Sequence, residues 1–177
     1  MSQENFAEYV AEIVTWRTRR EVELRAPDSW LSLVGLFVLS EGLHTIGSSA
    51  SNAIVLPPSA PDYLGIIEFL HNKASLTITT DTPVLIDGVR GRRATLADNG
   101  NRQKPTLITS GSVTFFVHHF GDQYAIRVKD STSPSIATFP GLDWFTVKAE
   151  YRVEGKFVPY NTPRAIPIKT IVDTNSE

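Results

Sequence analysis

Residues 43–65, "LHTIGSSASNAIVLPPSAPDYLG", carry the clearest signal of the fold. Two short apolar runs flank a turn of small hydroxyl and amide side chains, and a proline-broken loop follows the second run. Glycine, serine and asparagine favour turns because they tolerate or stabilise turn conformations. The stretch therefore predicts two β-strands and their connection. A second interpretation stays open, in which the turn holds an anion with N–H groups and hydroxyls; its candidate ligand-binding residues are Ser48, Ser49, Ser51 and Asn52.

The same texture continues to residue 130. Short apolar or alternating runs recur between glycine, proline, asparagine and aspartate clusters, at the spacing of about 8–12 residues that is typical of all-β sandwiches and barrels. Asp87 and Gly88 predict a tight hairpin turn, because both tolerate positive φ. We therefore expect a mainly β fold, an antiparallel β-sandwich over residues 27–150.

Both flanks differ from the sandwich. In the first 26 residues, apolar side chains recur at helical spacing, at Phe6, Tyr9, Val10, Ile13 and Trp16. This pattern predicts one amphipathic helix. Glu21 is four residues from both Arg17 and Arg25, the spacing at which side chains on a helix form ion pairs. Residues 151–177 are punctuated by three prolines, so we expect an extended tail of edge-type strands.

Composition excludes several classes of function. The chain has no cysteine, which excludes disulfides, thiolate metal sites and cysteine nucleophiles. A net charge of -2 gives no reason to expect nucleic acid or an anionic membrane as partner. The N-terminus lacks the basic start of a secretory signal, and the apolar runs are too short to span a bilayer. We expect a soluble, cytoplasmic protein.

Basic residues concentrate between positions 85 and 129, a stretch that contains seven basic and three acidic residues. They would either be solvated individually or form a patch for an anion; the candidate ligand-binding residues among them are Arg90, Arg92, Arg93 and Arg127. Arg127 and Lys129 share one strand face and would pair with acids such as Asp143 or Glu150, or bind an anion.

Other candidate sites have weaker support. His118 and His119 are neighbours on an expected strand, so they would point to opposite faces and not share a metal ion. Ser112 lacks the strand–turn–helix elbow of a serine hydrolase, and no glycine-rich phosphate loop occurs. We expect no catalytic residue, no metal and no cofactor. The large aromatic residues predict core or interdomain packing, at Trp30, Phe37, Phe139, Trp144 and Phe145.

Over residues 16–172 the chain resembles the domain of unknown function 1684 family of bacteria and archaea. The resemblance is carried by "PDSWLSLVGLFVLSEG" at 27–42, "IRVKDSTSP" at 126–134, "GLDWF" at 141–145 and "YRVEGKFVPY" at 151–160. Members of this family typically continue with a second half. The resemblance therefore implies that this chain is the N-terminal half and that residues 151–177 begin the missing part.

Residues 43–117 also resemble the forkhead-associated (FHA) fold, a β-sandwich that binds phosphothreonine peptides. Ile46-Gly47, the 52–56 strand, Asp87-Gly88 and "LITSGSVTF" at 107–115 match its strand and turn pattern. This resemblance implies the architecture. Ser48 stands where that family has an arginine, and 59–64 reads Ser-Ala-Pro-Asp-Tyr-Leu in place of serine-arginine-x-histidine. Recognition of phosphothreonine in the usual way is therefore not implied.

These observations leave three functional hypotheses. The first is a non-catalytic binding or interaction module, whose partner would be a protein or a small anionic ligand held by the sandwich loops. The second is an enzyme whose site needs a missing C-terminal half. The third is a structural subunit that forms a homodimer through a C-terminal edge strand.

Overall fold

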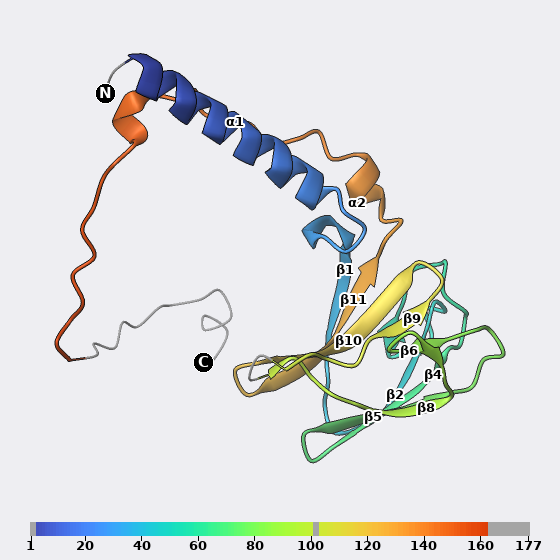
Figure 1. Cartoon of the computed structure of the whole chain (residues 1–177). Helices are drawn as coiled ribbons and strands as arrows, with labels where there is room; N and C mark the ends of the chain where they lie inside the picture. Colours follow the sequence, from blue (N-terminus) through green and yellow to red (C-terminus); the bar gives the residue numbers. More distant parts are fainter. Residues whose placement is uncertain (1–2, 101–102, 163–177) are drawn as a thin grey trace.

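The computed structural model describes residues 3–100 and 103–162. Figure 1 shows a β-sandwich, from which one long helix projects. Among the described residues, no helix is long and apolar enough to cross a membrane. The prediction of a mainly β sandwich preceded by one helix is confirmed.

The sandwich consists of two sheets. The six-stranded sheet has the order β1 (Leu33–Val38), β11 (Gln123–Asp130), β10 (Val113–Phe120), β9 (Ile108–Ser110), β6 (Leu85–Ile86), β7 (Val89–Arg90). The five-stranded sheet has the order β3 (Ile54–Val55), β2 (Gly42–Gly47), β4 (Gly65–Leu70), β5 (Lys73–Ile78), β8 (Arg93–Leu96). Neighbouring strands pair antiparallel, except that the two-residue β3 runs parallel to β2.

The core lies between the two sheets. Alternate residues of each strand point inward, so β4 reads buried–exposed along its whole length. Ile67, Leu76, Ile108, Phe115 and Ile126 are at most 1 % exposed. Fully burying such a side chain contributes roughly 1.5–3 kcal/mol. The alternation that predicted the strands is therefore also what holds the sheets together.

The predicted hairpin turn is present between β6 and β7. Asp87 has φ +49° and Gly88 has φ +83°, the positive values that a tight two-residue turn requires. The side chain of Asp87 accepts a hydrogen bond from the N–H of Leu107 at 2.9 Å, which attaches the turn to the strand leading into β9.

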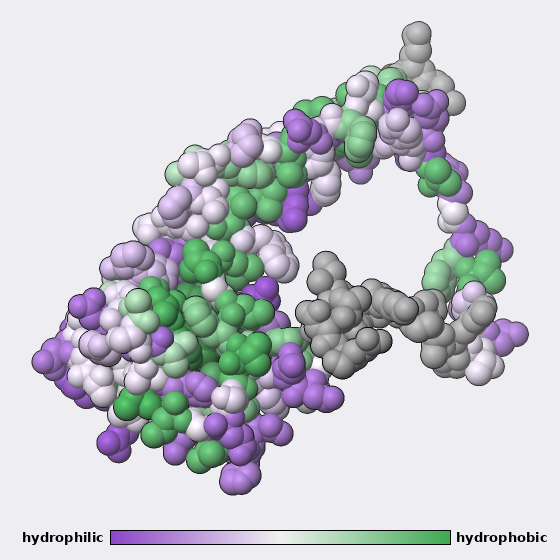
Figure 2. Space-filling model, turned by 180° about the vertical axis from the view of Figure 1, so that it is seen from behind, coloured by the Kyte–Doolittle hydropathy of each residue, from purple (hydrophilic) through white to green (hydrophobic). Residues whose placement is uncertain are grey.

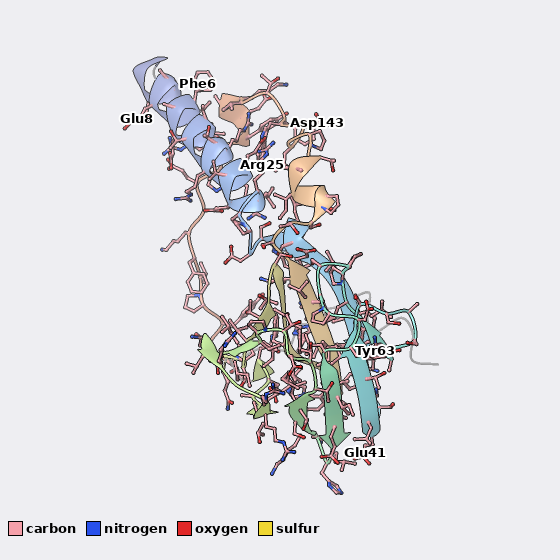
Figure 3. All side chains as sticks on the ribbon, turned by 90° about the vertical axis from the view of Figure 1, so that its right-hand side faces the viewer. Phe6, Glu8, Arg25, Glu41, Tyr63 and Asp143 are labelled. Atoms are coloured by element: carbon pink, nitrogen blue, oxygen red, sulfur yellow. The ribbon has the colours of Figure 1, made fainter. Side chains whose placement is uncertain are left out.

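Helix α1 (Gln3–Leu24) is packed against a chain segment and not against the sandwich. After α2 (Pro134–Ala137), residues 139–152, which we call the strap, run back along the helix toward its N-terminus (Figure 1). Trp144 packs edge-on against Trp16 with ring centroids 5.4 Å apart, and Arg152 lies over the Tyr9 ring. Figure 3 shows Asp143 of the strap beside the helix, and Glu41 at the end of the sandwich far from it.

Glu21 anchors the strap. Its carboxylate accepts hydrogen bonds from the N–H of Leu142 (3.2 Å), the indole N–H of Trp144 (3.1 Å) and the guanidinium of Arg25 (2.9 Å). The predicted Glu21–Arg25 pair is thus confirmed. The predicted Arg17–Glu21 pair is wrong, because Arg17 lies over the Trp144 ring and donates to the carbonyl of Phe145 at 2.6 Å.

The prediction that all the large aromatics lie in a core or interdomain contact is wrong for two of them. Trp30 is 66 % exposed and Phe145 is 83 % exposed. The physical reason is that the helix stands away from the sandwich. The connection between α1 and β1, residues 25–32, which we call the neck, is therefore left uncovered, and so is the side of the strap that faces away from the helix. Figure 2 shows apolar surface along the helix and on the sandwich next to it.

The expected tail strands fall partly on residues 163–177, which lie outside the described residues. Residues 152–162 are exposed and form no strand. Whether the tail pairs with a partner stays a prediction.

Candidate ligand-binding surface

One end of the sandwich collects the loops that follow β2, β3, β5 and β7. Sheet register brings them together, since Ile46 near the end of β2 pairs with Gly65 at the start of β4, which pairs with Ile78 at the end of β5. A backbone hydrogen bond of 2.8 Å from the N–H of Ile78 to the carbonyl of Arg92 places the start of the β8 segment next to the end of β5. We call this end, formed by residues 48–53, 56–64, 79–84 and 91–92, the loop end.

The "GSSASN" turn is attached to the neighbouring loop by its backbone. The N–H groups of Ser48 and Ser49 donate to the carbonyls of Pro61 and Asp62, at 2.9 and 3.2 Å. The close approach requires Gly47, because a Cβ there would lie 2.2 Å from the Asp62 carbonyl oxygen. These N–H groups therefore face the protein, and the turn acts as a strand connection.

The hydroxyls of the turn also bond to each other. Ser49 Oγ lies 2.9 Å from Ser51 Oγ, which lies 2.8 Å from the hydroxyl of Tyr63. Hydrogen bonds from Ser51 and then Ser49 lower the pKa of Tyr63. The amide of Asn52 donates to the carbonyls of Ser49 and Asp62 at 2.9 and 2.8 Å. That Ser48, Ser49, Ser51 and Asn52 bind a ligand stays a prediction.

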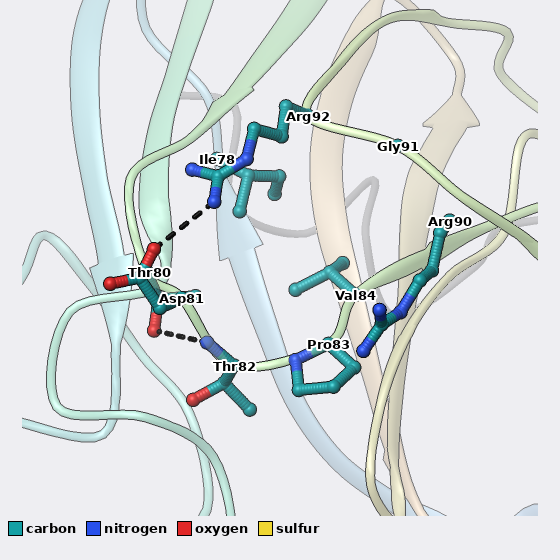
Figure 4. A pocket seen from close by; sticks show the side chains of 9 residues that line it. All are labelled: Ile78, Thr80, Asp81, Thr82, Pro83, Val84, Arg90, Gly91 and Arg92. Atoms are coloured by element: carbon teal, nitrogen blue, oxygen red, sulfur yellow. Dashed lines mark hydrogen bonds and ion pairs between the residues drawn. The ribbon is translucent and has the colours of Figure 1, made fainter.

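A cleft of about 360 Å³ opens at the loop end between the 79–84 loop and residues 90–92 (Figure 4). Arg92 pairs with Asp81 at 3.1 Å, and Thr80 Oγ1 accepts a hydrogen bond from the N–H of Thr82 at 3.2 Å. No carboxylate of the described residues lies within the 4.0 Å ion-pair distance of Arg90, which lines the same cleft. Two guanidinium groups and one carboxylate give the cleft a surplus of one positive charge.

The four predicted arginines do not form one patch. Arg90 and Arg92 line the cleft, whereas Arg93 points from β8 into solvent and is not among its lining residues. Arg127 lies on the outer face of the six-stranded sheet, 5.5 Å from the centre of the Trp30 ring. Only Arg90 and Arg92 are therefore brought together at the loop end.

The predicted pairing of Arg127 and Lys129 with Asp143 or Glu150 is wrong. Lys129 donates to the backbone carbonyl of Asp28 at 2.7 Å, and Glu150 pairs with Lys148 at 3.4 Å. The strap follows the helix away from the sheet, which keeps these acids from the sheet face.

The two histidines point to opposite faces, as predicted. His119 stacks on Tyr124 at 4.2 Å and lies 3.7 Å from Asp98, while His118 stacks on Phe120. Burial lowers the pKa of His118, and the charge of Arg127 lowers it further. Across residues 3–100 and 103–162, no group of three ligands is placed to hold a metal ion.

Ser112 belongs to a hydroxyl cluster and not to a catalytic triad. Its Oγ donates to Ser59 Oγ at 3.1 Å and accepts from Thr132 Oγ1 at 3.3 Å, and none of these partners is a histidine. Burial raises the pKa of neighbouring Asp130, but hydrogen bonds from Thr132 and Ser112 outweigh it and lower the pKa overall. The cluster joins the two sheets at the loop end.

Sequence reasoning missed part of the cleft. Thr80, Asp81 and Thr82 line it, and the signal was the run "TTDT" at 79–82, directly after an alternating strand. Hydroxyls and a carboxylate in a loop held by strands are typical of a binding position.

No family model matches the chain, and no curated protein matches it. Similar solved structures include an FHA domain from a structural and functional analysis of phosphothreonine-dependent FHA domain interactions. It is 17% identical in sequence, the match covers 53% of this chain and 92% of that chain, and the TM-score is 0.37. The FhaA FHA domain, complexed with the intracellular domain of Rv3910, has 17% identity, coverage of 53% and 97%, and a TM-score of 0.37. The N-terminal FHA domain of S. cerevisiae Rad53p, with a phosphothreonine peptide, has 9% identity, coverage of 53% and 70%, and a TM-score of 0.31.

Proposed function

We propose that this chain is a non-catalytic binding module that takes an anionic ligand in the loop-end cleft. The observation that carries the proposal is Arg90, a guanidinium that lines the cleft without a carboxylate of the described residues within ion-pair distance. Arginine binds carboxylates and phosphates through charge-assisted, often bidentate hydrogen bonds. A phosphate or carboxylate group is therefore the ligand chemistry that this cleft favours.

Arg92 would join Arg90 on the ligand. Its present partner is weakly held, because the side chains of Arg92 and Asp81 are 67 % and 98 % exposed. Such surface ion pairs contribute about 0–1 kcal/mol. A ligand anion that contacts both arginines could therefore displace Asp81.

Threonine hydroxyls add neutral donors to the same cleft. Thr80 Oγ1 accepts from the N–H of Thr82, which leaves the hydroxyl hydrogen of Thr80 able to donate to a ligand. A phosphate offers three acceptor oxygens and so could use both arginines and a hydroxyl. A phosphorylated protein segment is accordingly the first ligand that we would test. Ser48 stands where the FHA pattern has an arginine, so in this chain Arg90 and Arg92 would supply the positive charge for the phosphate.

The other hypotheses have less support. Ser112 has hydroxyl neighbours and no histidine partner among the described residues, so the serine–histidine pair of a hydrolase is not found there. Dimerisation through the C-terminal edge concerns residues outside the described part of the chain. Membership of the domain of unknown function 1684 family remains a proposal that rests on the sequence segments at 27–42, 126–134, 141–145 and 151–160.

The test is a thermal melt followed by isothermal titration with inorganic phosphate and a phosphothreonine peptide. A ligand that binds only the folded state raises the melting temperature. We expect Arg90→Gln to weaken binding by about tenfold, the loss of one charge-assisted hydrogen bond. Arg93→Gln is the matched control, because it removes the same charge from an exposed neighbour that does not line the cleft.

Two results would contradict the proposal. One is the absence of a saturable shift with either probe. The other is an equal loss of affinity in Arg90→Gln and Arg93→Gln, which would indicate non-specific attraction of anions to a basic surface.

A further inference from the structure

A second basic site lies on the outer face of the six-stranded sheet, away from the loop end. Strand register places Phe116 opposite Arg127, and Thr114 opposite Lys129. Val128 and Phe115 alternate with these residues and are buried in the core. Arg127, Lys129 and Phe116 therefore share the face that points away from the core.

The neck between helix and sandwich covers this face in part. Ser29 caps the short helix η1 (Trp30–Ser32), which holds the Trp30 ring 5.5 Å from the guanidinium carbon of Arg127. A groove of about 200 Å³ remains between the neck and the sheet, lined by Asp28, Ser29, Trp30, Leu33, Phe116, Arg127 and Lys129. The lining therefore combines apolar and aromatic side chains with two cations and one acidic residue.

The cations of the groove are not neutralised by the protein. In the described ranges, no carboxylate lies within 4.0 Å of Arg127 or Lys129, although Asp28 lines the groove. Lys129 donates to the backbone carbonyl of Asp28, and Arg127 Nη1 lies 3.4 Å from His118 Nε2. Both cations thus contact neutral groups and keep further N–H donors for a ligand.

The neighbouring histidine is arranged to stay neutral. Arginine can only donate, so the Arg127 contact requires an unprotonated Nε2 on His118. On the other side of the ring, Nδ1 lies 2.9 Å from the amide nitrogen and 3.2 Å from the amide oxygen of Asn99. Burial and then the charge of Arg127 lower the pKa of this histidine, which favours its neutral form beside the guanidinium.

Trp30 is left largely uncovered because the helix stands away from the sandwich. It is 66 % exposed, although large apolar side chains usually go to the core. Arg127 uses one face of the indole, and the exposed remainder of the ring can stack on a ligand. Aromatic pairs prefer offset-stacked or edge-to-face contacts, worth about 0.5–1.5 kcal/mol beyond their buried area.

We infer that this groove binds a small free molecule that carries one aromatic ring and one carboxylate or phosphate group. The ring would lie between Trp30 and Phe116, and the anion would accept hydrogen bonds from Arg127 and Lys129. The groove volume of about 200 Å³ is below the roughly 300–1,000 Å³ of sites for drug-sized ligands, so a single ring fits the available space better than a larger molecule. The inference is independent of the proposed function, because it uses none of the residues of the loop-end cleft.

The experiment uses Trp30 as a local reporter. The chain contains three tryptophans, so a Trp16→Phe/Trp144→Phe variant leaves Trp30 alone, with the sandwich unchanged. Phenyl phosphate and benzoate are titrated into this variant and, by calorimetry, into the unmodified chain. Inorganic phosphate tests the anion without the ring, and benzyl alcohol tests the ring without the anion.

We expect phenyl phosphate to change the Trp30 fluorescence saturably with one site per chain. Arg127→Gln should raise the dissociation constant by about tenfold, the loss of a charge-assisted hydrogen bond. Lys129→Gln should raise it by a smaller factor, because Lys129 already donates to Asp28. Trp30→Leu should remove the preference for phenyl phosphate over inorganic phosphate, whereas Arg93→Gln, which lines neither the groove nor the loop-end cleft, should leave the Trp30 response to phenyl phosphate unchanged.

Several results would overturn the inference. Equal affinity for inorganic and phenyl phosphate would show a plain anion site without a ring pocket. Unchanged binding in Lys129→Gln and Arg127→Gln would exclude the groove, and if Arg127→Gln melts early, Lys129→Gln and Trp30→Leu decide the question. Loss of the Trp30 fluorescence response in Arg90→Gln would place the ring-bearing ligand in the loop-end cleft and not in the groove.

Discussion

Gly47→Ala should destabilise the sandwich at the loop end. A Cβ at this position would lie 2.2 Å from the carbonyl oxygen and 2.7 Å from the carbonyl carbon of Asp62, and 2.9 Å from the Cα of Tyr63. All three atoms are backbone, so no side chain can rotate away. Real Cβ contacts are essentially never shorter than 3.0 Å, and the Asp62 carbonyl must therefore retreat by at least 0.8 Å.

The energetic consequence follows from the bonds that this movement breaks. The Asp62 carbonyl accepts hydrogen bonds from the N–H of Ser49 at 3.2 Å and from the amide of Asn52 at 2.8 Å, and a displacement of this carbonyl disrupts both. Two lost hydrogen bonds cost about 1 kcal/mol each. Overpacking adds about 1–3 kcal/mol. We expect a total loss of about 3–5 kcal/mol in the free energy of unfolding.

Thermal and urea denaturation of Gly47→Ala measure this loss. For a domain of this size, about 3 °C of melting temperature corresponds to 1 kcal/mol, so we expect a decrease of about 9–15 °C. Gly155→Ala is the control, because a Cβ there meets no atom within 4 Å. Equal melting temperatures for the two variants would refute the reasoning, since they would mean that the 56–64 loop adjusts without breaking its backbone bonds.

Three further predictions concern the strap, the core and the hairpin. Hydrogen bonds from Arg25, from the Leu142 N–H and from Trp144 lower the pKa of Glu21. The carboxylate therefore stabilises the strap fully above the unfolded pKa of about 4.3, and this stabilisation is lost as the pH falls through the lower folded pKa. The fluorescence of Trp144 should report the loss, and Glu21→Gln should abolish its pH dependence. Phe115→Ala should lower the free energy of unfolding by about 3–5 kcal/mol, because the side chain is fully buried between the sheets; a loss below 1 kcal/mol would contradict the described core. Gly88→Ala, at φ +83°, should cost about 1 kcal/mol through backbone strain alone, because a Cβ there meets no neighbour, and an unchanged urea midpoint would count against this turn geometry.

Several features of the fold could be predicted from local patterns. The alternation along residues 65–78 predicted β4 and β5, because one strand face must be apolar to cover a core. The helical spacing of apolar residues predicted α1. Asp87-Gly88 predicted its turn, because few residue pairs adopt two positive φ values. These properties depend on residues within one turn or a few positions of each other.

The candidate sites depended on strand order and register, which local patterns do not contain. Arg92 follows a short strand and Arg127 lies within one, yet Arg92 lines the loop-end cleft and Arg127 lies on the outer face of the six-stranded sheet. Trp30 resembled a core residue, and only the direction in which α1 leaves the sandwich exposes it. Which side chains meet is a property of long-range strand pairing, whereas which segments become strands follows from the alternation of apolar and polar residues along the chain.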